Sequence, residues 1–538
     1  MERLEDDEFV QSSYILMIGY LLSSLISSLG TIIVIRLISV EEYGLINISF
    51  IIPAILIVLG ELGLNYSSTY FIAKKIKENN FKEVRDVIRM NLFIKISLGL
   101  IFSILVFLYS TYIAIEIYKV TDQRLILLIQ IGAIGIFARI VLEAMNSFFL
   151  GALNVKLVQI GAILQTSVRT GLSIILILIG FSYLGPMIAF VLSPLFVVIF
   201  YLFFIRRIFF KDKIEKESIN WKELSKMVKY GYPLLFLSAV ASIQLPMYSY
   251  ILTINGFLTE VSYLNVAIVS ASIIGILTKS ISYTLFPIFS KLDWNNDNER
   301  EKKKLIQYFQ FSNKFSTILI IPITILLIFF SKELFPIIYG ESYREAAPFI
   351  SGYFVIFFLV SFGSLSIPAF FNGQNQTKYV LYIQLIEIIS ILLFSLIFIP
   401  LFGPLGLIYG IIVGSIISII YGNILIRKKY GNILFENIRN IIGIFSIAII
   451  LGILTFYVYN FLGIFIHGEL IFITIINIIA SLLFFLLLFL FLIGISSLIT
   501  IEELEFFEKS FAKFPVINKV IILLSKIEKK ILKVKIKL

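Results

Sequence analysis

The sequence predicts an all-α polytopic membrane protein, and three observations lead to that class. Of its 538 residues, 59% are hydrophobic and only 15% are charged, whereas a soluble domain carries roughly 25% charged residues. The mean hydropathy is +0.99. The apolar runs suit transmembrane helices of about 20 residues and far exceed barrel strands of about 10. We therefore expect a helical bundle, which satisfies its backbone hydrogen bonds within lipid.

Hydropathy and helix-breaking residues predict fourteen transmembrane helices. The first residues are acidic, unlike the basic start of a signal peptide, so we expect no cleaved leader. We place the spans at residues 14–37, 45–73, 91–118, 125–151, 157–182, 185–205, 231–254, 263–290, 307–331, 349–372, 379–401, 404–427, 439–463 and 470–498.

The lysines and arginines predict how the spans are oriented. An even number of spans puts both termini on one side, and that side carries 35 of the 45 basic residues while the other carries five. By the positive-inside rule, both termini are cytoplasmic, and we expect a multi-pass protein of the cell membrane. The net charge of +11 is then mainly a topology signal, and we expect no nucleic-acid partner.

An internal repeat divides the first twelve spans into two pseudo-symmetric six-helix lobes. Residues 148–158, FFLGALNVKLV, match residues 370–380, FFNGQNQTKYV, at an offset of 222, and Asn47 matches Asn265 at 218. Six spans per copy make this a parallel repeat. The predicted parts are an N-terminal lobe at 1–205, a cytoplasmic inter-lobe loop at 206–230, a C-terminal lobe at 231–427, helices 13 and 14 at 439–498, and a basic amphipathic cytoplasmic tail at 499–538.

Six charged residues fall well inside predicted spans, where a charge costs about 2.5–3.5 kcal/mol and usually faces a cavity or a partner. Arg139 and Glu143 are four residues apart, the spacing of an ion pair on one helix face. Lys95 lies nearer a span end, and we expect its ammonium group to extend to the membrane surface. The six are Glu61, Arg139, Glu143, Arg169, Lys279 and Glu387.

The repeat suggests where four of these charges meet. At an offset of 218, Glu61 aligns with Lys279 and Arg169 aligns with Glu387, so each lobe places a charge where the other places its opposite. We expect a polar cavity between the lobes that contains both signs. For Arg169 and Lys279, packing against an inter-helix partner is the alternative.

The composition also excludes several kinds of chemistry. The chain has no cysteine and one histidine, His467. This excludes disulfides, thiolate nucleophiles, iron–sulfur clusters, cysteine-type zinc sites and histidine-rich metal sites. We expect no metal and no cofactor.

Several stretches, in order along the chain, resemble a known family. They are SVEEYGLINISF followed by LGELGL, the segment from FFLGALNVKLV to YLGP, KYGYPLLF, TLFPIFSKL, and EAAPFI running into FFNGQNQTKYV. Over about residues 10–430, the chain resembles the Wzx-type polysaccharide-biosynthesis flippases of the multidrug/oligosaccharidyl-lipid/polysaccharide exporter (MOP) superfamily.

This resemblance implies a transporter without catalytic residues, not an enzyme. Such a flippase moves a polyprenyl-phosphate- or polyprenyl-pyrophosphate-linked oligosaccharide to the outer leaflet by alternating access, for cell-surface polysaccharide or glycan assembly. Membrane lipid surrounds it, and glycosyltransferases or a polymerase are candidate partners. Related lipid II flippases have a basic residue on the eighth span, where Lys279 lies. Arg169 and Lys279 would bind phosphate. Asn65, Gln165 and Tyr248 would hydrogen-bond sugar hydroxyls, with ordinary hydrogen bonding between helices as the alternative for these three.

Two other functions remain as alternatives. A cation-coupled drug or small-molecule exporter of the same superfamily would use Glu61 or Glu387, although the first span lacks the aspartate typical of such exporters. Many polysaccharide flippases carry an aspartate in the seventh span, where this chain has QLPMYS at residues 244–249. A membrane-embedded glycosyltransferase or polymerase ranks last, because the longest outer loop, residues 332–348, has no catalytic pattern.

Overall fold

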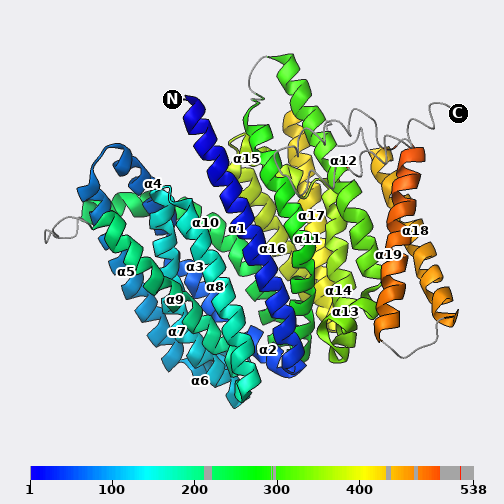
Figure 1. Ribbon diagram of the computed structural model, residues 1–538, viewed down its shortest axis with the longest axis horizontal. Helices are drawn as coiled ribbons and strands as arrows, with labels where there is room; N and C mark the ends of the chain where they lie inside the picture. The colour runs from blue at the N-terminus through cyan, green and yellow to red at the C-terminus, as the bar shows by residue number, and fades with distance from the viewer. Residues whose placement is uncertain are drawn as a thin grey trace. The chain divides into compact units, whose positions relative to one another are not determined.

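A computed structural model describes the backbone of residues 2–210, 221–292, 294, 298–431, 438–465, 471–496, 498 and 522. Side chains are described at most of these positions, but not at Lys279. Every regular element in the described part is a helix (Figure 1). The elements are α1 (Glu2–Leu37), α2 (Val40–Ser49), α3 (Ile51–Glu61), α4 (Leu64–Lys77), α5 (Phe81–Leu108), α6 (Ser110–Tyr112), η1 (Ile113–Ile117), α7 (Gln123–Gly151), α8 (Val155–Leu176), η2 (Ile177–Phe181), α9 (Leu184–Phe209), α10 (Trp221–Ile254), α11 (Leu258–Ser290), α12 (Glu299–Phe329), α13 (Ser331–Tyr339), η3 (Glu341–Ala346), α14 (Ala347–Phe354), η4 (Val355–Phe362), α15 (Ser366–Gly373), α16 (Thr377–Phe402), α17 (Leu405–Tyr430), α18 (Ile438–Phe465) and α19 (Ile471–Ile495).

The helices confirm the predicted all-α polytopic class. In the described part of the chain, 12 helical segments are long and apolar enough to cross a membrane. The 34-residue α10 and the 33-residue α11 occupy the positions of the predicted seventh and eighth spans. The total of fourteen spans stays a prediction, and the predicted tail falls almost wholly outside the described residues, as does most of the inter-lobe loop.

Contacts between helices group the chain into two compact units, Met1–Val269 and Ser270–Leu538. In the first unit, α7 packs against α5 and α9, α1 packs against α8, and α10 packs against α3 and α4. In the second unit, α16 packs against α17, and α12 packs against η4 and α18. The predicted seventh span therefore belongs to the first unit by its contacts. The two six-helix lobes predicted from the sequence repeat are a different division of the chain, and they stay a prediction.

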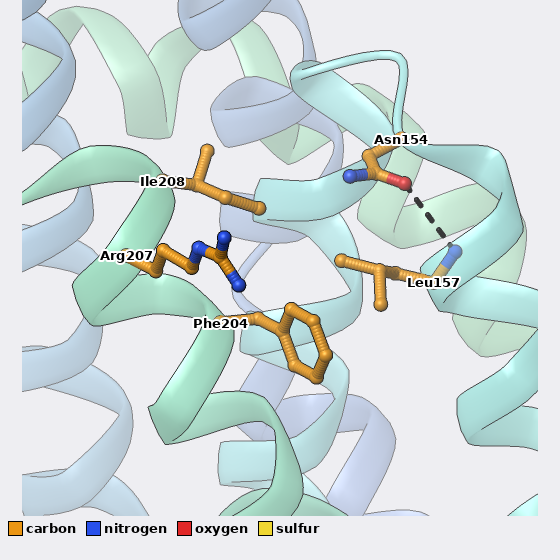
Figure 2. A pocket seen from close by; sticks show the side chains of 5 residues that line it. All are labelled: Asn154, Leu157, Phe204, Arg207 and Ile208. Carbon is orange, nitrogen blue, oxygen red and sulfur yellow. Dashed lines mark hydrogen bonds between the residues drawn. The ribbon is translucent and has the colours of Figure 1, made fainter.

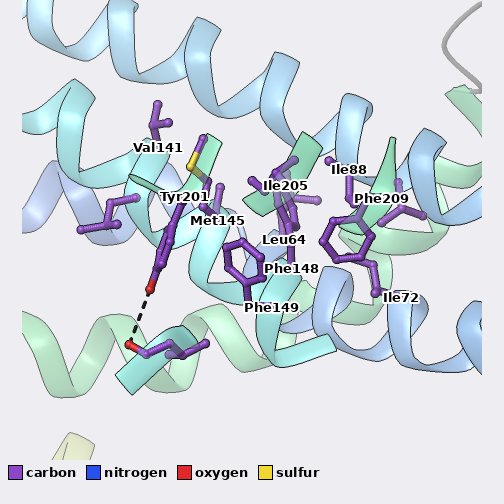
Figure 3. Close-up of a cluster of buried hydrophobic side chains, with 14 of the residues drawn as sticks. Leu64, Ile72, Ile88, Val141, Met145, Phe148, Phe149, Tyr201, Ile205 and Phe209 are labelled. Carbon is purple, nitrogen blue, oxygen red and sulfur yellow. Dashed lines mark hydrogen bonds between the residues drawn. The ribbon is translucent and has the colours of Figure 1, made fainter. Parts of the chain in front are cut away.

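The core of the first unit lies among α4, α5, α7 and α9. Phe148, Phe149 and Tyr201 are fully buried there, and the rings of Phe149 and Tyr201 meet edge to face at a centroid distance of 4.8 Å (Figure 3). In lipid such a core depends on close packing and interhelical hydrogen bonds, because the surroundings are as apolar as the side chains. The Tyr201 hydroxyl donates to the carboxamide oxygen of Asn146 at 2.9 Å, which joins this core to the polar residues of α7.

The turns that follow the two FFxG motifs have the same geometry. Leu153 and Asn375, 222 residues apart, both have a positive φ, at 55° and 56°. The next residue donates its N–H to the second phenylalanine of the motif in each case, Asn154 to Phe149 and Gln376 to Phe371, both at 2.8 Å. The repeated motif in the sequence is therefore also a repeated turn.

The second predicted span is broken into α2, α3 and α4. The break between α3 and α4 consists of Leu62 and Gly63, which are left-handed with φ values of 45° and 68°. Gly63 lies against Gly231 of α10, where a Cβ on either glycine would overlap the other's backbone. The Ser67 hydroxyl donates to the Met227 carbonyl at 2.6 Å and joins the same two helices. This break positions the polar residues of the first unit.

Candidate functional site

Arg139 and Glu143 form the predicted ion pair on α7. The guanidinium of Arg139 lies 2.8 Å from the Glu143 carboxylate. Asn146 donates its amide N–H to the same carboxylate at 3.2 Å and accepts the Tyr201 hydroxyl. Both charged side chains are partly exposed, at 34% and 26%, so the pair is held in place but still accessible.

Lys95 does not extend to the membrane surface, and that expectation is wrong. Its side chain is fully buried, and its ammonium group donates to the carbonyls of Gly60 at 3.0 Å and Glu61 at 2.8 Å. The physical reason is that α5 begins at Phe81 rather than near residue 91. Lys95 is then about 21 Å along its helix, at 1.5 Å per residue. From there it reaches the carbonyl end of α3, which carries partial negative charge.

Asn91 is a second polar residue of α5 that sequence reasoning missed. Its amide N–H groups donate to the Leu64 carbonyl at 3.3 Å and to the Ser68 hydroxyl, on the α4 side of the break. Asn91 and Lys95 are one helical turn apart, so one face of α5 holds both sides of the break. In the sequence, the spacing of four between these two polar residues in an apolar helix indicates that they share one helix face.

Glu61 lies at the break, where α3 ends. Its carboxylate interacts electrostatically with Lys95, Arg139 and Glu143. The structure thus brings together three of the predicted site residues, Glu61, Arg139 and Glu143, and adds Lys95 to them. They come from the consecutive spans that contain α3, α5 and α7.

Arg169 lies near the middle of the 27-residue span Val155–Phe181. Its side chain is exposed, and its guanidinium carbon lies 5.7 Å from the ring centroid of Phe190 on α9. It is within electrostatic range of Arg139, and it forms no ion pair with the residues that the structure describes. With Lys95 and Arg139, it gives the middle of this unit three cations against the two carboxylates Glu61 and Glu143.

The three uncharged candidates are in different surroundings. The carboxamide oxygen of Asn65, next to the break, is buried and has no hydrogen-bond partner among the described residues. Gln165 lies one turn before Arg169 on α8. Tyr248, on α10, is buried, and its hydroxyl accepts the Gln244 amide at 2.7 Å.

Two candidates lie in the second unit. Glu387 accepts a hydrogen bond from the Ser415 hydroxyl at 3.0 Å and interacts electrostatically with Tyr353. The matching turns before α8 and α16 set the local offset at 222, so Glu387 corresponds to Gln165, one turn before Arg169. Lys279 lies in α11, but its side chain is outside what the structure describes. Its relation to Arg169 therefore stays a prediction.

The second unit also contains an apolar cavity of about 550 Å³. Its walls come from η4, α17 and the first residue of α18, and its only polar lining residues among those described are Asn423 and Arg427, on the last two turns of α17. The lining residues are Val355, Ile356, Phe358, Leu359, Phe362, Ile412, Ile416, Ile419, Ile420, Asn423, Ile424, Arg427 and Ile438. A hydrocarbon chain with a charged end fits this distribution.

Comparisons with known proteins found a matching family and one relative in sequence. A family model described as "Polysaccharide biosynthesis protein" matches residues 33–348. An uncharacterized membrane protein of Methanocaldococcus jannaschii is 25% identical over 456 residues, which are 80% of this chain and 87% of that protein.

Two solved structures resemble the fold. One is the lipid II flippase MurJ in an inward closed conformation, with a TM-score of 0.67, 17% identity, and coverage of 88% of this chain and 98% of MurJ. The other is an inward-facing multidrug resistance MATE family transporter of the MOP superfamily, with a TM-score of 0.61, 16% identity, and coverage of 76% and 95%.

Proposed function

Because this chain belongs to the polysaccharide biosynthesis protein family, we propose that it is a flippase for a polyprenyl-phosphate- or polyprenyl-pyrophosphate-linked oligosaccharide. It moves the head group from the cytoplasmic to the outer leaflet by alternating access. The fold shared with MurJ supports a transporter architecture. The substrate class rests on the family and on the charges of the first unit.

The observation that carries the proposal is the accessible cation Arg169, beside an ion pair that already neutralises Arg139. A phosphate that leaves water for a region of low dielectric needs replacement charge and hydrogen bonds. A guanidinium supplies both, because it binds phosphate oxygens in a bidentate manner. The Phe190 ring lies within cation–π distance of this guanidinium, 5.7 Å from its central carbon.

The hydrocarbon tail has different requirements. A prenyl chain gains nothing from a polar path and can stay in lipid or in an apolar groove. The cavity along η4 and α17 has apolar walls with Arg427 among its lining residues. Its apolar walls suit a prenyl chain, independently of the head-group site in the first unit.

The membrane potential would help this transport. With the inside negative, outward movement of each negative charge gains about 2.3 kcal/mol per 100 mV. A flippase for an anionic lipid can therefore run on the potential without a coupling ion. We expect faster translocation when an inside-negative potential is imposed on proteoliposomes.

Reconstituted protein and a fluorescent lipid-linked oligosaccharide test the proposal. A membrane-impermeant reductant quenches only the label in the outer leaflet of the liposome. The measurement is the rate at which the quenched fraction of the label changes as the lipid crosses the membrane. Arg169→Ala should slow translocation by about tenfold or more, and Arg169→Lys should recover part of the rate. Arg36→Ala removes an exposed arginine at the end of α1 and serves as the matched control.

Two results would count against this function. If Arg169→Ala transports the lipid at the wild-type rate, Arg169 does not bind the head group. If instead the protein drives proton- or sodium-coupled efflux of organic cations, and Glu61→Gln abolishes it, the protein is an exporter. Glu61 lies close to the cations Lys95 and Arg139, which disfavours binding of a further cation there.

A further inference from the structure

A small cavity lies at the end of the first unit where α8 begins and α9 ends. Its volume is about 370 Å³, within the range of roughly 300–1,000 Å³ of ligand pockets. Figure 2 shows the Arg207 side chain reaching from α9 toward Leu157, between Ile208 and Phe204. Asn154, the residue that caps α8, completes the lining.

The polar groups of this pocket are available. Arg207 is exposed and makes no ion pair, hydrogen bond or ring contact with the residues that the structure describes. Asn154 uses its carboxamide oxygen to accept the Leu157 N–H, which leaves its amide N–H groups facing no described partner. A cation and a hydrogen-bond donor therefore share one pocket with the apolar side chains of Leu157, Phe204 and Ile208.

The repeat provides an internal comparison for this pocket. At the offset of 222 set by the two matching turns, Leu157 corresponds to Tyr379. The ends of α9 and α17 match at an offset of 221, where Phe210 and Gly431 each donate to the carbonyl four residues earlier, so Arg207 corresponds to Lys428 and Ile208 to Lys429. In the second unit, the Lys429 ammonium lies 5.3 Å from the Tyr379 ring centroid and 5.8 Å from that of Tyr430. Tyr379 thus engages a cation at the end of α17 there. In the first unit, the aliphatic Leu157 at the position of Tyr379 leaves Arg207 without a ring contact among the described residues.

The surroundings of the pocket identify its ligand class. One turn along α8, Ile160 is 49% exposed, and next to Phe204 the ring of Phe203 is 66% exposed. Such exposed apolar side chains on membrane helices face lipid tails. Basic pockets between transmembrane helices bind the head groups of anionic lipids. We propose that this pocket binds the phosphate group of an anionic membrane phospholipid through Arg207 and Asn154, with its acyl chains along Ile160 and Phe203.

Native mass spectrometry of the full-length protein in detergent tests this site with phosphatidylglycerol as the probe. The measurement is the fraction of protein that retains lipid as the lipid concentration rises. Arg207→Gln should weaken retention about tenfold. The variant Leu157→Tyr copies the second unit at this position, and it should weaken retention to a similar degree although Arg207 is kept. Lys429→Gln is the matched control and should bind as wild type does.

Each other result overturns the proposal. Wild-type retention by Arg207→Gln would show that the lipid binds elsewhere, and equal loss in Lys429→Gln would show only general charge attraction. Equal retention of phosphatidylcholine would remove the role of the anionic phosphate. Displacement of the lipid by inorganic phosphate at low concentration would assign the pocket to a free anion. Thermal unfolding of each variant checks that the substituted protein folds.

Discussion

At the residue scale, the buried lysine of α5 is the least expected feature of this protein. A lysine in the apolar part of a membrane is costly unless partners replace its water. Here the carbonyls of Gly60 and Glu61 accept two of its three N–H groups, and the Glu61 carboxylate lies within electrostatic range. Lys95 is therefore both a charge of the candidate site and the cap of a helix end.

Replacing this lysine tests its capping role. Lys95→Met keeps the length of the side chain but leaves two buried carbonyls without a donor, so we expect a loss of about 1–3 kcal/mol in the free energy of unfolding. Denaturation of the purified protein measures this loss. Lys156→Met, at an exposed lysine of α8, is the control and should change little. Equal stability of the two variants would contradict the cap.

A second residue, Asp122, makes the stability depend on pH. It lies just before α7, accepts the Arg124 N–H at 2.8 Å, and also accepts the Arg124 guanidinium. Hydrogen bonding from Arg124 lowers the pKa of Asp122 below its ordinary value. Because the folded pKa is the lower one, the stabilisation is complete above the ordinary pKa and is lost as the pH falls through the folded pKa.

We therefore expect wild type to lose stability relative to Asp122→Asn as the pH is lowered from about 5 to about 2, by at most about 1 kcal/mol after solvent screening. Asparagine still caps α7 but does not titrate in this range. Thermal unfolding of both proteins over this pH range measures the difference. Parallel pH profiles for the two proteins would contradict the assignment.

At the element scale, the broken second span shows where sequence reasoning reaches its limit. Apolar length predicts a span at 45–73, and a span is there. The sequence does not predict a break at Leu62 and Gly63, because the groups that hold it, Asn91 and Lys95, belong to another helix. Whether these two side chains reach the break depends on where α5 begins. The sequence predicts the span only from residue 91, because the residues before it are rich in acidic and basic side chains, whereas α5 begins at Phe81.

The contact between this break and α10 makes a prediction about two glycines. Gly231→Ala would place a Cβ against the Gly63 backbone, and overpacking of this kind costs about 1–3 kcal/mol. Gly171→Ala, in α8, meets no atom within 4 Å and should be neutral or slightly stabilising by helix propensity. Thermal unfolding of the two variants compares a packed with an open glycine. A Gly231→Ala variant as stable as Gly171→Ala would exclude a tight crossing.

At the scale of the whole molecule, the orientation of the chain is the main prediction still open. Because the chain has no cysteine, single cysteines can be introduced without background. An impermeant maleimide should label Thr121→Cys in intact cells and Lys156→Cys only in inverted membrane vesicles. Both positions are exposed in the structure. The opposite pattern would reverse the orientation inferred from the 35 basic residues.

The repeat could be predicted from the sequence, but its consequences for the site could not. The offset of 222 between FFLGALNVKLV and FFNGQNQTKYV holds for the turns in these two motifs. Asn47 and Asn265, matched at an offset of 218, each donate a side-chain hydrogen bond to the carbonyl four residues earlier. The alignment of Arg169 with Glu387 missed by one turn, because the offset changes between helices. The Arg139–Glu143 pair was predictable, since both residues lie on one helix and need no other.

The lysine cap also bears on how the membrane keeps its electrical insulation. A helix broken in mid-membrane exposes carbonyls that attract water, and a file of water molecules would let protons leak down the gradient that a cell maintains. The Lys95 ammonium occupies the carbonyls of Gly60 and Glu61 with a side chain instead. We therefore expect the span to be broken at this depth without opening a path for water, and so without a proton leak.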